Sequence, residues 1–243
     1  MEETYESLRD QALRKLKSYM DSLEESKGKK LAYWVSDYAR FLNKEQTFVP
    51  QKNVRYKRGS VVKAHLGFRI GSEEGGLHYA IVIDSENQLS SPTVTVVPLT
   101  SIKDSTDLSK LHHSKLSLGS EIYDLLSKKA NMEIDSINED LDDLSNKFNA
   151  VAAGDENAYS RSLLNKELKR LRKRLNHCND VADEIKKMKN GSIALVGQIT
   201  TISKIRIYDP QRPKDPLSGL RVSDNTLNQL DDVICNLYTG KNK

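Results

Sequence analysis

The sequence is poor in cysteine, in aromatic residues and in long apolar runs. Its two cysteines, Cys178 and Cys235, lack the close spacing of metal ligands and are typical of reduced, mostly buried thiols in a cytoplasmic protein. Aromatic residues make up 6% of the chain. No stretch approaches the roughly 18 apolar residues that a spanning helix needs, and the N-terminal MEETYESLRD does not resemble a signal peptide. We therefore expect a protein without a membrane segment.

The common catalytic and nucleotide-binding motifs are also absent. The sequence contains no GxxxxGK[ST], HExxH, GxSxG or CxxC. Charge is abundant, with 38 Lys and Arg against 34 Asp and Glu and a formal net charge of +4. This excess is compatible with a polyanionic partner, although it does not identify one.

The first fifty residues have the period of helices. Apolar residues at Ala12, Leu16, Tyr19 and Leu23 fall on one face. The polar stretch 26–30 is expected to break this helix before a second one, which ends before Pro50. We expect an N-terminal helical extension over residues 1–50.

Strand-like patterns follow. The segments RGSVVKAHLG, HYAIVIDS and TVTVVPLTS, and later SIALVGQITTISKIRI, are rich in β-branched residues and separated by turn-forming residues. Short spacing between the first three favours an antiparallel sheet or small barrel. A last helix carries Leu227, Leu230, Ile234 and Leu237 on one stripe after a plausible cap at Ser223.

Two long heptad patterns separate the strand segments. The first runs from Ala130 to Val151 and the second from Leu164 to Ile185, which predicts an antiparallel helical hairpin inserted over residues 119–189. Residues 119–149 contain three lysines and eight acidic residues, whereas residues 160–189 contain ten basic and four acidic residues. We expect these charges to pair the two helices rather than to bind nucleic acid. The sheet domain would then comprise residues 54–118 plus 190–240.

Five histidines are the clearest candidates for acid–base chemistry. His177 lies in the basic helix and is expected to be solvated, and His65 is expected to point outward from a strand. His78 stands where the loop GSEEGG meets a strand, and Thr100 and Ser101 end a strand that could run beside it. By position alone, a histidine at the start of a strand is more often structural than catalytic.

The order of the four strand segments resembles the PemK/MazF family of toxin endoribonucleases. This resemblance implies an α+β fold, with an SH3-like small β-barrel of the MazF/CcdB type and a C-terminal helix. It also implies a cytoplasmic homodimer that cleaves single-stranded RNA without metal or cofactor and is restrained by a cognate antitoxin. Attack of the ribose 2′-OH on the adjacent phosphate would give a 2′,3′-cyclic phosphate and a 5′-OH end.

The family motifs identify the candidate site residues in this chain. The family loop GSEQGGxRP corresponds to residues 71–79, which sets His78 at the position of the catalytic arginine and Tyr79 at that of the proline. The catalytic threonine corresponds to Thr100 and the loop acid to Glu73, with Ser101 beside them, while the family's EQIRTI block loses its glutamate and retains Gln198. RNA contacts are implied at Arg58, Ser72, Gly75, Gly76, His112, His113 and Gln198.

Histidine in place of arginine leaves two functions open. Arginine is permanently charged, whereas histidine titrates near pH 6.5 and can act as base or acid. Our hypothesis is that His78 is the principal acid–base group. The alternative is a catalytically silent binding module of the MazF/CcdB type acting on a protein or RNA. The helical arm could also direct a nuclease to a protein or ribosome.

Overall fold

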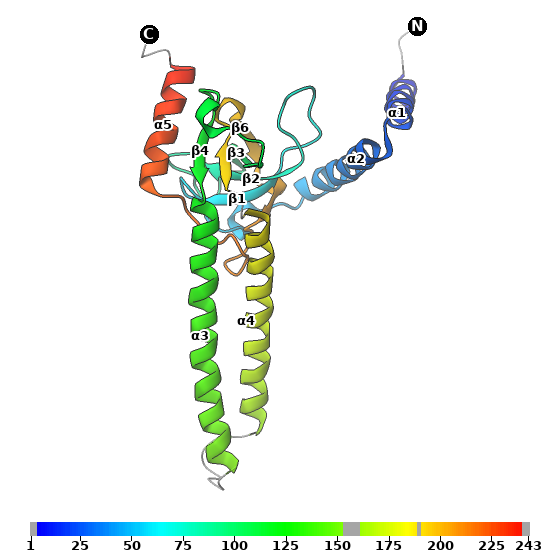
Figure 1. Cartoon of the computed structure of the whole chain (residues 1–243). Coiled ribbons are helices and arrows are strands. Elements are labelled where there is room, and N and C mark those ends of the chain that lie inside the picture. The colour runs from blue at the N-terminus through cyan, green and yellow to red at the C-terminus, as the bar shows by residue number, and fades with distance from the viewer. Residues whose placement is uncertain (1–3, 153–160, 189–190, 240–243) are drawn as a thin grey trace. The chain divides into compact units, whose positions relative to one another are not determined.

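A computed structural model of the chain describes residues 4–152, 161–188 and 191–239 (Figure 1). The chain divides into two compact units. The first joins residues 1–48 to 65–77, and the second joins residues 49–64 to 78–243. The three domains predicted from the sequence have other boundaries than these two units, and they stay a prediction.

The first unit contains α1, Tyr5–Asp21, and α2, Glu25–Glu45. Two helices were predicted, but the expected break at residues 26–30 is wrong. The break lies at residues 22–24, because the Ser22 hydroxyl donates to the Tyr19 carbonyl at 2.7 Å and ends α1. The polar stretch remains helical, with an ion pair between Glu25 and Lys29 one turn apart.

The second unit is built on an antiparallel sheet. Its strands follow the order β4-β5-β3-β2-β1-β7, and β6 pairs with β3 outside this path. Their bounds are β1 Val61–His65, β2 Leu77–Val82, β3 Thr93–Ser101, β4 Leu116–Gly119, β5 Ser192–Ala194, β6 Thr200–Ser203 and β7 Ile207–Asp209. Short 3-10 helices lie at Pro50–Lys52, Leu108–Lys110, Val196–Gln198 and Lys204–Arg206.

The nine-residue strand β3 is paired along both edges. On one edge it pairs with β2, with Ala80 opposite Pro98. On the other edge its first half pairs with β6 and its second half with β5. The turn Val196–Gln198 separates β5 from β6 and takes up the change of register between them. One strand therefore sets the position of three others.

The predicted mixed α+β class is confirmed, whereas a closed barrel is not found. The order of strands is an open path, and no pairing joins β4 to β7 in the part of the chain that the structure describes. The mostly β-branched segments do form strands, because their side chains are buried on the sheet.

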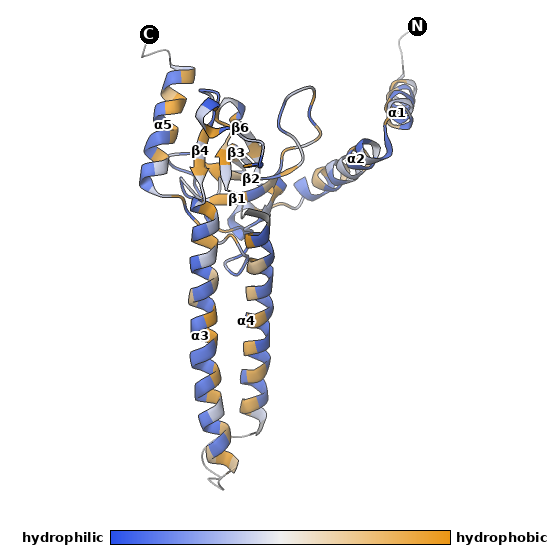
Figure 2. Ribbon diagram, in the orientation of Figure 1, coloured by the Kyte–Doolittle hydropathy of each residue, from blue (hydrophilic) through white to orange (hydrophobic). Residues whose placement is uncertain are grey.

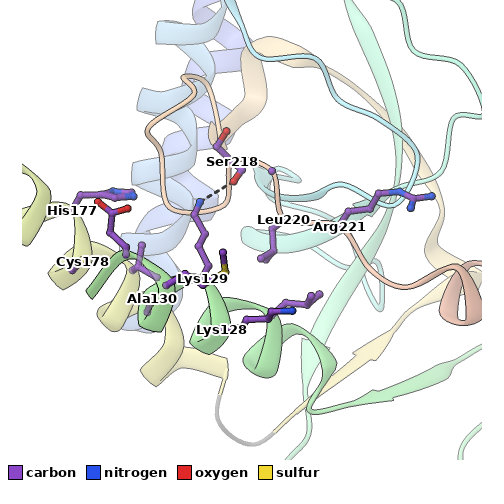
Figure 3. A pocket seen from close by; sticks show the side chains of 13 residues that line it. Lys128, Lys129, Ala130, His177, Cys178, Ser218, Leu220 and Arg221 are labelled. Atoms are coloured by element: carbon purple, nitrogen blue, oxygen red, sulfur yellow. Dashed lines mark hydrogen bonds between the residues drawn. The ribbon is translucent and has the colours of Figure 1, made fainter. Parts of the chain in front are cut away.

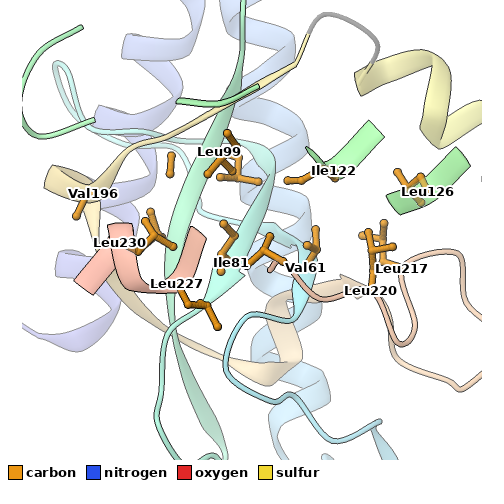
Figure 4. Close-up of a cluster of buried hydrophobic side chains, with 14 of the residues drawn as sticks. Val61, Ile81, Leu99, Ile122, Leu126, Val196, Leu217, Leu220, Leu227 and Leu230 are labelled. Atoms are coloured by element: carbon orange, nitrogen blue, oxygen red, sulfur yellow. The ribbon is translucent and has the colours of Figure 1, made fainter. Parts of the chain in front are cut away.

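The core of the second unit lies against β2 and β3 (Figure 4). Helix α5, Asp224–Tyr238, covers it with Leu227 and Leu230, and Ser223 caps this helix as predicted by accepting from the Thr226 amide at 3.2 Å. The first turns of α3 contribute Ile122 and Leu126 to the same core. The sheet and the base of the hairpin thus share one apolar cluster.

The hairpin begins and ends at two neighbouring strands. Helix α3, Glu121–Ala152, follows β4, and α4, Arg161–Met188, precedes β5, while β4 and β5 pair with each other (Figure 1). Gly191 closes the return to the sheet with φ +82°, and a Cβ there would lie 2.6 Å from the Gly119 carbonyl oxygen. Only glycine fits this position without movement of the backbone.

The heptad pattern is only half buried. Ile137 and Leu144 of α3 pack with Leu171 and Cys178 of α4, while Ala130 belongs with Val181 to the core of the second unit. The alternate heptad residues stay half exposed, at 44% for Ile134 and Leu141 and 52% for Leu168 and Leu175. The helices therefore meet mainly through every seventh residue of each pattern.

Apolar and polar residues alternate along every labelled helix (Figure 2). Among the described residues, no helix is both long and apolar enough to cross a membrane.

We predict that Gly191→Ala destabilises the second unit more than Gly219→Ala. Both glycines have positive φ, but a Cβ at Gly219 meets no atom within 4 Å. Gly219→Ala should lower the free energy of unfolding by about 1–2 kcal/mol through backbone strain alone. Gly191→Ala should cost about 1–3 kcal/mol more through the clash with the backbone. Urea unfolding followed by circular dichroism measures both, and equal losses would contradict the account.

Candidate active site

The sheet brings His78 and Thr100 together. The register of β2 and β3 pairs Ala80 with Pro98. Continued by two residues, it sets His78 opposite Thr100, and the side chains of opposite residues on one face have Cβ atoms about 5 Å apart. The His78 ring confirms the proximity of the strands, because its Nδ1 lies 3.1 Å from the Leu99 carbonyl oxygen. Both side chains are half-buried.

This hydrogen bond sets the position of one proton on the His78 ring. A carbonyl oxygen only accepts, so Nδ1 must carry the proton. In the neutral imidazole the lone pair is then on Nε2, which is the nitrogen that can take up a proton. A ring held in one tautomer by a backbone carbonyl is suited to act as a general base.

Ser101 does not share this face. Successive residues of a strand point to opposite faces, so the Ser101 side chain is directed away from Thr100 and His78. Ser101 is exposed at the end of β3, opposite Ser192. Its predicted role stays a prediction, without this geometric support.

Tyr79, next to His78, binds a buried carboxylate of the hairpin. The Tyr79 hydroxyl donates to Glu184 of α4, and Lys63 Nζ lies 3.0 Å and 3.1 Å from the two Glu184 carboxylate oxygens. Burial and the neighbouring Glu184 raise the pKa of the Tyr79 hydroxyl, so it stays protonated and donates. No local pattern in the sequence could indicate this contact, because Tyr79 and Glu184 lie 105 residues apart.

Asp209 completes this polar cluster from β7. It pairs with Lys63 across the sheet and accepts from the Leu217 amide at 3.0 Å. Burial raises the pKa of the Asp209 carboxyl to about 6, despite the opposing effect of Lys63. Strand β2 is therefore connected to the hairpin through Glu184 and, by way of Lys63, to Asp209 of β7.

A second group of predicted residues gathers beside the turn Val196–Gln198. The rings of His112 and His113 lie 4.0 Å apart, and His112 Nδ1 lies 2.7 Å from the Ser114 hydroxyl. The Gly197 amide donates to the Ser114 carbonyl at 3.0 Å, which places Gln198 next to this segment. Three predicted RNA contacts, His112, His113 and Gln198, thus lie near one another.

Arg58 lies away from His78. Its guanidinium donates to the Ile83 carbonyl and to Asp231 of α5. Ile83 is five residues beyond His78, about 16 Å along an extended chain. The predicted RNA contact at Arg58 therefore lies at the other end of β2.

The glycine-rich loop is part of the first unit. Leu66 and Gly76 hydrogen-bond at its base at 2.7 Å, and Glu73 forms a 3.8 Å ion pair with Arg69. Gly75 is required there, because a Cβ would lie 2.7 Å from the Gly67 carbonyl oxygen. This loop carries Ser72, Glu73, Gly75 and Gly76, whose participation in a site with His78 stays a prediction.

His65 has a structural role, and its expected outward orientation is wrong. Its ring stacks on Trp34 of α2 at 4.7 Å, and its Nδ1 accepts from the Gly67 amide at 3.0 Å. The stacking partner comes from a distant helix, so alternation along the strand could not reveal it.

No group of three or more His, Cys, Asp or Glu side chains suited to a metal ion occurs within residues 4–152, 161–188 and 191–239. The expectation of metal-independent chemistry stays a prediction.

Residues 57–137 match the model of a family described as PemK-like, MazF-like toxin of type II toxin-antitoxin system. The matched segment includes His78, Thr100 and His112, and it ends within α3. This confirms the resemblance noted in the sequence, over one third of the chain. A search of curated proteins finds no significant match.

We predict that Asp209→Asn stabilises the protein at pH 7.5 and has less effect at pH 4. The folded-state pKa of about 6 lies above the usual unfolded value near 4. The folded state therefore binds more protons in this window, and its stability falls as pH rises from 4 to 6. Asparagine removes this cost, about 1–2 kcal/mol after allowance for partial exposure.

Urea unfolding at both pH values measures the difference between wild type and variant. Replacement of the exposed Asp104 by Asn is the matched control for loss of a charge. If Asp209→Asn changed the free energy of unfolding equally at pH 4 and pH 7.5, the result would contradict a raised pKa for the Asp209 carboxyl.

Proposed function

We propose that this chain, whose residues 57–137 carry the PemK-like, MazF-like toxin match, is an endoribonuclease of a type II toxin–antitoxin system. The observation that carries the proposal is the His78 ring, which donates from Nδ1 to the Leu99 carbonyl and lies across from Thr100. A general base and a hydroxyl donor on one face of a sheet are what cleavage of RNA needs.

The reaction would be an internal displacement at phosphorus. His78 Nε2 takes the proton of the ribose 2′-OH, and the 2′-oxygen attacks the adjacent phosphate. A new bond forms between the 2′-oxygen and phosphorus, while the bond to the 5′-oxygen breaks. That oxygen takes a proton from solvent water and becomes the 5′-OH end, His78 returns its proton to solvent, and the other product ends in a 2′,3′-cyclic phosphate.

Thr100 would stabilise the charge that develops on the phosphate. Its hydroxyl donates to a phosphoryl oxygen as negative charge accumulates there, and such a contact acts mainly on the transition state. In the matched family the arginine provides both proton transfer and charge stabilisation. Here His78 would provide the first function, and Thr100, with backbone amides, the second.

The finer features of the family complete the proposal. The curved antiparallel sheet would be an SH3-like barrel of the MazF/CcdB type that acts as a cytoplasmic homodimer on single-stranded RNA. A cognate antitoxin would restrain it. The pair His112-His113, beside Gln198, would contact the RNA chain.

A binding module without catalysis is the second candidate. The departures from the family at His78 and Gly197 favour it, because both replace charged groups of the family motifs. RNA binding without cleavage, at high protein concentration, would support this alternative.

We predict that His78→Ala and His78→Gln lower the rate of RNA cleavage by about 100-fold to 10,000-fold, the range of general acid–base catalysis. Cleavage of single-stranded RNA by purified protein in EDTA is measured by gel electrophoresis. The unfolding midpoint and the affinity for 2′-O-methyl RNA should be retained in both variants. Full activity in His78→Ala would exclude His78 as the acid–base group.

We predict that Thr100→Val lowers the cleavage rate by about 100-fold, as expected for loss of one donor to a developing oxyanion. Thr95→Val is the matched control, since Thr95 lies on the same strand and its hydroxyl contacts Thr201 at 3.1 Å. Single-turnover rates separate the two. Equal effects of the two substitutions would show that Thr100 has no special role.

A further inference from the structure

The basic side of α4 is largely unpaired with the acidic helix. Arg174 does cross the hairpin, binding Glu133 at 2.7 Å and also Asp140 and Ser136. The only other ion pair between the helices within the described ranges joins Lys147 of α3 to Glu167, at 3.8 Å. The expectation that pairing accounts for the basic residues of α4 therefore holds for Arg174 alone.

Four of the remaining cations form a stripe. Lys166, Lys169, Arg170 and Lys173 are exposed, and none of them has an ion pair or hydrogen bond with any side chain that the structure describes. Steps of three and four residues place them on one face of the helix. His177 continues this face by one turn, so the stripe extends over about 16 Å.

The stripe forms one wall of a cleft, which we call the basic cleft. The cleft has a volume of about 890 Å³, and Pro213, Lys214 and Ser218 line its other wall. Glu133 is the one acidic residue among its described lining residues, and it is bound to Arg174. The four cations of the stripe thus face Lys214 across an open space.

The second wall is held in place by Lys129. Its ammonium donates to the carbonyl of Pro216 at 2.7 Å and to that of Ser218 at 2.8 Å. Figure 3 shows the bond to Ser218. Burial lowers the pKa of Lys129, and these carbonyls compensate for its lost hydration. A smaller cavity of about 510 Å³ adjoins the basic cleft and shares Lys129, Glu133, His177 and Ser218 with it. One wall of the cleft is therefore helix α4, and the other is a loop that hydrogen bonds from Lys129 hold in place.

We infer that the basic cleft binds the phosphate backbone of RNA, at a site separate from His78. A row of cations about 16 Å long exceeds what one phosphate can occupy and suits an extended polyanion. Lysine is depleted in the buried centres of protein–protein interfaces, which disfavours a protein partner. The choice of RNA over other polyanions rests on the proposed function.

Binding in the basic cleft would be independent of RNA sequence. Contacts to phosphate position a nucleic acid but do not read its bases. The stripe contains no Phe, Tyr or Trp on which bases could stack. The inserted hairpin would thus hold the RNA chain, while the residues around His78 cut it.

The test is the salt dependence of RNA binding. Fluorescence anisotropy with a labelled 2′-O-methyl RNA gives the Kd between 50 and 200 mM salt, and this RNA cannot be cleaved because it has no free 2′-OH. The variant K166Q/K169Q/R170Q/K173Q should weaken binding and lower the slope of log Kd against log salt by up to about 3, near 0.7 for each lost contact. All four residues are exposed, so an unchanged unfolding midpoint is expected.

The matched control removes the same charge elsewhere. In K27Q/K30Q/K52Q/R172Q, three exposed lysines outside the hairpin and one arginine off the stripe are replaced. This control should keep the slope of the wild type. Equal slopes for the stripe variant and the control would overturn the inference.

Two further measurements separate the possible failures. Poly-glutamate of equal charge should displace the labelled RNA only weakly. Displacement as strong as that by unlabelled RNA would contradict RNA as the ligand and would favour an acidic protein. His78→Ala should bind the 2′-O-methyl RNA as the wild type does. If the wild type binds this RNA but does not cleave unmodified RNA, the proposed function is contradicted and the basic cleft is not. If the stripe variant binds with the same salt dependence as the wild type, only the proposal for the basic cleft is contradicted.

Discussion

The pairing of β3 along both edges is the constraint on which the second unit depends. On one edge it sets β2, and so sets His78 across from Thr100. On the other edge it sets β5 and β6 in one continuous segment broken by a three-residue turn. Because β5 also pairs with β4, the same strand determines where the hairpin begins and ends. The candidate site and the insertion are two consequences of one strand.

The hairpin is joined to the sheet by more than chain connectivity. Its base shares the apolar core, and Glu184 accepts hydrogen bonds from both Tyr79 and Lys63. A buried carboxylate with two donors is costly to disturb, since removing either donor leaves the charge undercompensated. Tyr79, the residue after His78, therefore connects the candidate site to an element outside the matched segment.

Much of this architecture could be predicted from local pattern. The β-branched segments became strands, and two heptad patterns became paired helices, because period and propensity agree with the final packing. Contacts between distant residues could not be predicted in this way. His65 stacks on Trp34, Arg58 binds Asp231, and Lys166, Lys169, Arg170 and Lys173 form no ion pair with the side chains that the structure describes, for reasons set by three-dimensional packing. In the candidate site, sequence identified His78 and Thr100, but only the strand pairing explains the ring orientation and separates Ser101 from them.

The central claim is that His78 and Thr100 promote attack by a ribose 2′-OH. The most direct measurement uses an RNA whose cut site has been mapped, with the single nucleotide before the scissile phosphate replaced by its 2′-deoxy form. The account predicts that this one change abolishes cleavage there, while the unmodified RNA gives 2′,3′-cyclic phosphate and 5′-OH ends by mass spectrometry. Cleavage of the 2′-deoxy substrate at the same phosphate would contradict it, because water would then be the attacking group.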